Sequence, residues 1–354
     1  MGARSFGLAC IGLAMVSSQA CAYSSKTTGS GVMLYGIVDA SVEYAKGSQS
    51  ALRMHEGENS ASRLGMRGVE DLGDGLKAIM TLEAGFNTDN GKEFFGNGML
   101  FGRQAYVGLA NDWGELRLGR QYSPSFYALL KLDPFTLNGQ NSPFGLFSSV
   151  SSQGTGYVAY TSRFNNAVQY LSRDFGPVSF AAFVAPGGEY GSGKTNLSYG
   201  ANVIYETSKA LLFYTYLGRH GGEAVDAALF SSHFVGGGYR FGPVRLGGVF
   251  QLAHSGLGKT REARGYGLTL NWDVTGRDVF KAVVVKRHVV GTDDSPLATT
   301  LGWDHSLSKR TTLYSRLVFV HNSPDGSTTL NDIKIEPRSG DSGRSISFGI
   351  MHRF

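Results

Sequence analysis

The sequence is poor in cysteine and proline, and beyond its first residues it has no long apolar run. Both cysteines, Cys10 and Cys21, lie near the N-terminus, so no disulfide or thiolate metal site is expected in the rest of the chain. No later stretch reaches the ~18 apolar residues that a membrane-spanning helix needs. The net charge of +5 over 354 residues is too small for a nucleic-acid-binding surface.

The N-terminus has the form of a secretory signal. Arg4 supplies a positive charge, the stretch 6–16 is apolar, and Ala20-Cys21-Ala22 offers a cleavage site with small residues. We therefore expect residues 1–22 to be removed and residues 23–354 to be exported. A lipoprotein signal, in which Cys21 carries lipid, is disfavoured because residues 18–20 lead poorly into that motif.

The full chain is rich in residues that suit β-structure, with 50 Gly, 22 Phe and 17 Tyr. Its apolar side chains recur at every second position, as where Val38 and Val42 alternate with Asp39 and Glu43. A polar chain whose strands keep one apolar face fits a closed transmembrane barrel, in which all backbone groups are paired. A soluble sandwich or propeller also alternates, but the signal and the absence of later cysteine argue against it.

Sixteen such segments can be counted, which predicts an all-β, 16-stranded antiparallel transmembrane β-barrel. They lie at 32–44, 62–69, 76–86, 101–109, 115–121, 158–171, 177–185, 196–206, 209–219, 228–240, 243–253, 263–274, 278–290, 296–307, 311–321 and 344–354. Short turns alternate with long connections, among them 45–61, 87–100 and 322–343. This pattern is typical of bacterial outer-membrane barrels, and sixteen strands leave room for an aqueous channel.

The last segment ends on an aromatic residue at the C-terminus. Apolar Ile346, Phe348, Ile350 and Phe354 share one face of it, which we expect to meet lipid. This strand should pair with the first one and close the barrel.

Several short motifs lie within these segments. They are 34–39, Ser62-Arg63-Leu64-Gly65, Gly102-Arg103-Gln104, Leu118-Gly119-Arg120-Gln121 and the closing His352-Arg353-Phe354. Together they resemble the general-diffusion porins of Gram-negative outer membranes, in particular the β-proteobacterial branch. The resemblance is most specific in the first half and the last strand.

This resemblance implies a water-filled channel in the cell outer membrane for passive diffusion of small hydrophilic solutes and ions. It implies a homotrimer in contact with outer-membrane lipid and lipopolysaccharide, and no cofactor, metal or nucleic acid. Phe354 resembles the family's terminal signal for the barrel-assembly machinery.

The connection at about 122–155 is too long for an ordinary turn, and it is rich in aromatic residues that favour packing over disorder. The resemblance implies a constriction loop folded into the lumen. Its notable residues are Lys131, Asp133, Phe135 and Phe144. Asp133 is its sole carboxylate, because Ser142-Pro143-Phe144-Gly145 stands where enteric porins carry an acidic Pro-Glu-Phe-Gly motif.

Opposite the loop, the resemblance places a basic wall at Arg63, Arg103 and Arg163. Guanidinium groups crowded on one wall set a transverse field, so several arginines facing one carboxylate should favour anions. Further candidates for lumen charges are Arg67, Arg120, Asp39 and Glu83. Alternation puts Arg103 on the face of the apolar Ala105; we expect Arg103 to point inward while Gln104 and Tyr106 meet a neighbouring subunit.

Three other functions are considered. Residues 188–195 fit a phosphate-binding loop, but alternating residues follow where that loop needs a helix. No H-E-x-x-H or G-x-S-x-G motif supports an outer-membrane hydrolase. A substrate-specific channel, or a receptor acting through the long loops, stays open.

Overall fold

The computed structural model describes residues 30–95, 98–137, 141–148, 161–187, 196–221, 228–256, 262–329 and 340–354. The predicted signal, residues 1–22, and the glycine-rich stretch 188–195 lie outside them. Strand β9 (Ser198–Glu206) follows that stretch. No helix among the described residues is long and apolar enough to span a membrane.

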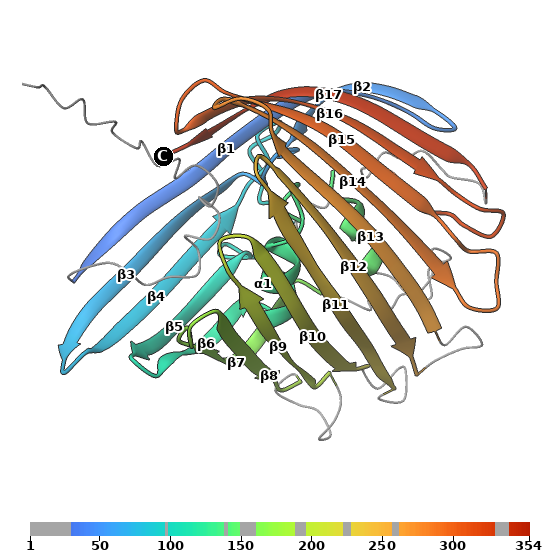
Figure 1. Cartoon of the computed structure of the whole chain (residues 1–354). Helices are drawn as coiled ribbons and strands as arrows, with labels where there is room; N and C mark the ends of the chain where they lie inside the picture. Colours follow the sequence, from blue (N-terminus) through green and yellow to red (C-terminus); the bar gives the residue numbers. More distant parts are fainter. Residues whose placement is uncertain are drawn as a thin grey trace, which may run out of the picture.

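Seventeen strands form one antiparallel sheet. They are β1 (Gly31–Lys46), β2 (Ser50–Glu56), β3 (Arg63–Gly73), β4 (Leu76–Gly85), β5 (Gln104–Asn111), β6 (Gly114–Tyr122), β7 (Arg163–Ser172), β8 (Val178–Ala185), β9 (Ser198–Glu206), β10 (Ala210–His220), β11 (Leu229–Phe241), β12 (Val244–Ser255), β13 (Glu262–Asp273), β14 (Asp278–Val289), β15 (Leu297–Ser306), β16 (Thr311–His321) and β17 (Ser342–Arg353). Apart from β2 and β3, which both pair with β1, strands that follow one another in the chain pair with each other, and β17 pairs with β1 to close the barrel (Figure 1).

The seventeen strands make a barrel of sixteen, because β2 and β3 occupy one edge of β1 in succession. Residues 31–37 of β1 pair with β3, and residues 40–46 pair with β2. The connection 45–61 was therefore wrongly predicted to lack a strand. The chain leaves the wall between β2 and β3, at residues 57–62, and these residues are buried inside the barrel.

Side chains alternate between the two faces of the wall as the period of two requires. Outward Val107, Leu268 and Phe348 are 57%, 69% and 61% exposed, whereas inward Asp39 and Thr300 are fully buried. In the membrane the outward side chains meet lipid, which explains how so many apolar residues remain uncovered. The predicted lipid face of the last strand is confirmed: Ile346, Phe348, Ile350 and Phe354 are all exposed.

Strand boundaries agree with the prediction to within two residues along most of the chain. Two strands begin later than predicted: β5 at Gln104 instead of residue 101, and β7 at Arg163 instead of residue 158. Residues 100 and 101 form a turn and residue 103 a bend before β5 begins, so strict alternation applies only from Gln104 onward.

The long connection after β6 carries a short helix, α1 (Pro124–Leu130), and a 3-10 turn, η2 (Pro143–Ser148), inside the barrel (Figure 1). The Ser123 side chain caps α1 by accepting a hydrogen bond from the Phe126 amide at 3.1 Å, and Pro124 opens the helix. The largest hydrophobic cluster lies between this loop and the inner wall, so the barrel's core fills part of its lumen.

Deleting Phe354 should lower the yield of assembled barrel more than it changes the conductance of the channels that form. Phe354 closes the barrel through reciprocal backbone hydrogen bonds with Gly36, 3.0 and 3.1 Å long. Folded protein in the outer-membrane fraction, scored by heat-modifiable electrophoretic mobility, is the measurement. Phe348→Ala, which removes an exposed aromatic from the same strand, is the control; an equal loss there would deny the terminal position any special role.

Candidate functional site: the pore constriction

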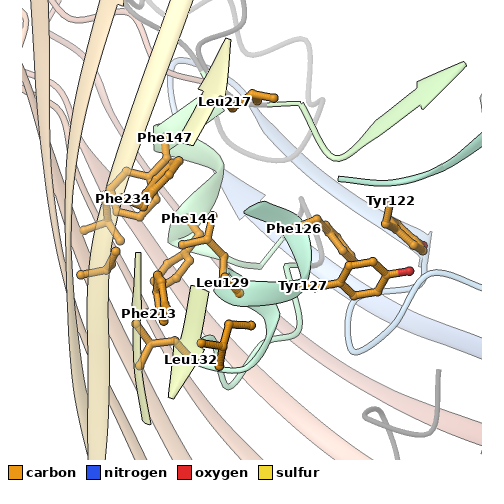
Figure 2. Close-up of a cluster of buried hydrophobic side chains, with 14 of the residues drawn as sticks. Tyr122, Phe126, Tyr127, Leu129, Leu132, Phe144, Phe147, Phe213, Leu217 and Phe234 are labelled. Carbon is orange, nitrogen blue, oxygen red and sulfur yellow. The ribbon is translucent and has the colours of Figure 1, made fainter. Parts of the chain in front are cut away.

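The loop between β6 and β7 is fixed to the wall by aromatic side chains. The Phe147 ring is fully buried and meets Phe234 of β11 edge-on, with ring centroids 5.6 Å apart (Figure 2). Glycines make room for this ring: a Cβ at Gly265 of β13 would lie 2.6 Å from the Phe147 ring. The Gln251 side chain donates to the Phe147 carbonyl at 2.8 Å. The loop is therefore a packed part of the interior.

Polar contacts hold the first half of the loop to the adjoining wall. Asn202 of β9 donates to the Pro124 carbonyl at 2.7 Å, and the hydroxyls of Ser125 and Thr215 lie 2.6 Å apart. Lys131 forms a 2.6 Å ion pair with Glu206. The loop thus lies against strands β8 to β15 and leaves the arginine-bearing strands β3 to β7 open to the lumen.

A second inward segment, residues 57–62 between β2 and β3, meets the tip of the loop. Asp39 anchors it, because its Oδ2 accepts the amides of Asn59 and Ser60 at 3.0 and 2.6 Å. The segment's carbonyls accept side chains of the loop, Asn141 at Glu58 (2.7 Å) and Thr136 at Asn59 (3.3 Å). Burial raises the pKa of the Glu58 carboxyl to about 7.

Arg103 and Arg163 converge on one hydroxyl. The Tyr122 hydroxyl, at the end of β6, accepts hydrogen bonds from Arg103 Nη2 at 2.7 Å and from Arg163 Nη2 at 2.6 Å. The Arg163 guanidinium also lies over the Tyr122 ring, 4.3 Å from its centroid. Arg103 Nε contacts Glu83 Oε1 at 2.8 Å. Two cations, one just before β5 and one at the start of β7, are therefore held side by side, and one carboxylate binds one of them.

Arg63 completes the basic wall at the start of β3. Its Nη2 donates to the Ser60 hydroxyl at 2.7 Å and its Nε to the Ala61 carbonyl at 2.9 Å. Arg63, Arg103 and Arg163 line one cavity of about 420 Å³, whose other side is the constriction loop. The loop side is formed by Thr136, Leu137, Ser142, Phe144, Gly145 and Ser148. No carboxylate is among the described residues that line this cavity.

Asp133 differs from its predicted place, because it does not face the arginines. Its carboxylate accepts the amides of Phe135 at 3.0 Å and Leu137 at 2.8 Å, and it also contacts the Ser142 hydroxyl. Only 4% of the residue is exposed. Burial raises the pKa of Asp133, against the lowering effect of these hydrogen bonds. A carboxylate so enclosed fixes the shape of the loop instead of balancing the basic wall.

Arg103 points inward as predicted, but the expected position of its neighbours was wrong. Gln104 and Tyr106 are buried on the inner face, where the Tyr106 hydroxyl accepts a 3.0 Å hydrogen bond from Thr81. The bend at residue 103 allows Arg103 to point into the lumen, although alternation would place it on the same face as outward Ala105. No second subunit is needed to explain it.

The other predicted charges lie on the inner wall or beside it. Glu83 contacts Arg103, and its Oε2 accepts the Tyr35 hydroxyl at 2.9 Å. The Arg67 guanidinium lies 4.7 Å from the centroid of the Tyr35 ring, outside the cavity lining. Arg120 donates to the Gly102 carbonyl at 2.6 Å and is also outside that lining. In the loop, Phe144 lines the cavity, while Phe135 packs under Lys281 and Arg316.

Two parts of the site were not predicted from the sequence. Tyr122 was assigned only as the first residue of the loop, although its place directly after Arg120 and Gln121 marks the end of a charged strand. The inward segment 57–62 was treated as an external connection. Its polar run Glu58-Asn59-Ser60, unlike a glycine-rich surface loop, was the available signal.

Comparisons with known proteins agree with this geometry. The family model for Gram-negative porins matches residues 9–325. Outer membrane porin protein 32 of Delftia acidovorans is 30% identical over 339 residues, which cover 92% of this chain and 94% of that protein. An outer membrane porin protein of Bordetella pertussis is 27% identical, with 91% and 94% covered.

Solved structures show the same architecture. The anion-selective porin from Comamonas acidovorans superposes with a TM-score of 0.81 at 28% identity, covering 92% of this chain and all of that one. The outer membrane protein OmpT of Vibrio cholerae, at 12% identity and a TM-score of 0.67, covers 93% of this chain and 99% of its own; at that identity it shows the fold alone.

Proposed function

This chain belongs to the Gram-negative porin family, and on that premise we propose that its outer-membrane diffusion channel prefers anions at the constriction. The carrying observation is the cavity between wall and loop, where three arginines face a loop surface without a carboxylate. With Glu83 counted, three positive charges and one negative charge leave +2. In a narrow passage with low-dielectric walls such a charge raises the local concentration of anions.

The related anion-selective porin supports this proposal, because it shares 28% of its residues across the full barrel. The electrostatics of this chain give the physical reason. The carboxylate of Asp133 accepts hydrogen bonds within the loop, and Lys131 forms an ion pair with Glu206. The arginines, by contrast, line open space. A diffusing solute would therefore meet guanidinium groups, hydroxyls and backbone at the constriction.

Planar bilayers with a salt gradient test the proposal. Wild-type protein should give stepwise, ohmic conductance and a reversal potential whose sign reports anion preference. A cation-selective reversal potential would refute the selectivity proposal, and complete absence of conductance would refute the channel. Saturable block by one solute would instead indicate a substrate-specific channel.

We also propose that the barrel assembles as a homotrimer through the wall formed by its shorter strands. Strand β5 has 8 residues and β6 has 9, whereas β11 has 13; a membrane strand ordinarily needs about 9–11, so β5 is short and β6 is at the lower limit. Their outward Val107, Leu109 and Leu118 are apolar and exposed. Packing against another copy would cover a face too short to match the bilayer. Conductance increments in groups of three, and a threefold mass in mild detergent, are expected.

We further propose two partners for the outer wall and the C-terminus of the barrel. Outer-membrane lipid and lipopolysaccharide would cover the remaining apolar wall, and the barrel-assembly machinery would recognise the strand that ends at Phe354. The exposed Phe348 of β17 and Phe354 at the C-terminus support both partners.

A further inference from the structure

Two carboxylates and one imidazole converge inside the barrel, away from the arginine wall. They belong to Glu43 of β1, His55 of β2 and Glu58 of the inward segment. One candidate ligand atom from each lies within 4.8 Å of the others. The three residues are 0%, 4% and 1% exposed. Buried ionisable groups gathered in this way must be paired or bind a cation to offset their desolvation.

The fold brings the three together through a hairpin and a sharp turn. In the β1–β2 hairpin, Glu43 lies opposite Arg53 and Ser41 lies opposite His55, so Glu43 and His55 face the lumen from adjacent strands. Gly57 then adopts a φ of +61°, which lets the chain turn off the wall and carry Glu58 beneath the hairpin. Three separate parts of the chain thus supply the three groups.

Glu58 is the member whose side chain calls for a ligand. Neither oxygen of its buried carboxylate makes a hydrogen bond of ordinary geometry with the described residues, although the side chains of Ser347 and Asn141 lie nearby. His55 Nδ1 is 3.6 Å from Glu58 Oε1, beyond ordinary hydrogen-bond length. A metal ion about 2.0–2.2 Å from each ligand atom would fill such a gap.

We propose that Glu43, His55 and Glu58 bind a divalent transition-metal ion of the zinc class. Two carboxylate oxygens and one imidazole nitrogen form a donor set suited to Zn²⁺ and related ions, with a further position open to water. Ca²⁺ fits poorly because it prefers six to eight oxygen ligands.

Arg53 lies at the edge of the cluster, beside Glu43. Its Nε and Nη2 both donate to Oε2 of Glu43, at 3.0 and 2.9 Å, and a two-oxygen carboxylate can serve a guanidinium and a metal together. The Arg53 side chain is 29% exposed, whereas the Glu43 side chain that it covers is fully buried. An ion would therefore reach Glu43 by displacing the Arg53 side chain.

The bound ion would restrain the inward segment 57–62, which contacts both the constriction loop and Arg63. The Glu58 carbonyl accepts Asn141 of the loop, and Ser60, two residues on, accepts Arg63. A metal that ties Glu58 to the β1–β2 hairpin would fix both contacts. The proposal is independent of ion selectivity, because the arginine charges remain whether or not the site is filled.

Zinc binding to purified, untagged, chelator-treated protein tests the site. Calorimetric titration with Zn²⁺ should give one equivalent per chain and raise the melting temperature of the folded barrel. Glu58→Gln and His55→Ala should each weaken binding by at least about tenfold. Ca²⁺ alone should give no comparable heat.

The chain offers a matched control in His254 and Glu262, which also approach to 3.6 Å but leave 46% of the imidazole side chain exposed. His254→Ala should retain full zinc binding. Absence of stoichiometric zinc binding by wild-type protein would overturn the proposal without any variant. So would undiminished affinity in Glu58→Gln protein that keeps heat-modifiable mobility.

Discussion

Replacing Arg63, Arg103 and Arg163 together with glutamine should reverse the ion preference of the channel. The change takes the local charge from +2 to −1, because Glu83 remains without its arginine partners. Since the field at the narrowest point decides which ion enters, the reversal potential in a salt gradient should change sign. Glutamine is polar and shorter than arginine, so the change removes the charges without narrowing the lumen.

Single substitutions should weaken or strengthen the anion preference according to the charge that they change. Arg163→Gln lowers the net charge to +1 and should weaken the anion preference, whereas Glu83→Gln raises it to +3 and should strengthen that preference. Lys286→Gln is the matched control, because Lys286 is exposed on the outer face of β14. The same loss of one charge there should leave the reversal potential unchanged.

Ionic strength provides an independent check on the electrostatic mechanism. The Debye length falls from about 10 Å at 0.1 M salt to about 3 Å at 1 M, so wild-type selectivity should shrink with concentrated salt. An anion preference that survives both the triple substitution and 1 M salt would show that the arginine wall does not control permeation.

The sequence predicts the strands well because a membrane imposes one rule on the whole wall. Every second residue must suit lipid, so segments such as Val32 to Tyr44 can be recognised as strands without knowing which strands they pair with. The same rule fails at Arg103, where a two-residue turn precedes the strand. It also misses β2, whose alternation covers only seven residues.

The lumen is harder to predict because its contacts join residues far apart in the chain. The arginines were placed by resemblance, but their shared acceptor Tyr122 emerges only when β5, β6 and β7 are assembled. Asp133 shows the opposite case. Its charge suggested a role facing the wall, yet local amides at Phe135 and Leu137 satisfy it first. Composition counts charges but does not show which are already paired.

Replacing Phe147 with alanine should loosen the constriction loop while leaving the wall intact. The substitution empties a fully buried site between Phe234 and the glycines of β13, and losses of about 3–5 kcal/mol are typical for such changes. Because the wall strands pair independently of the loop, the barrel should still insert. Single-channel records should show larger conductance and more frequent fluctuations than wild type.

A second variant tests the same anchor by the opposite change. Gly265→Leu adds a side chain where even a Cβ would lie 2.6 Å from the Phe147 ring, so it should displace the loop and give the same fluctuating channel. Were Gly265 only a wall residue, leucine would suit the strand better than glycine and leave conductance unchanged. Phe241→Ala, an exposed aromatic on β11, is the control for Phe147→Ala. Quiet, wild-type currents from both Phe147→Ala and Gly265→Leu would mean that this packing does not hold the loop in the pore.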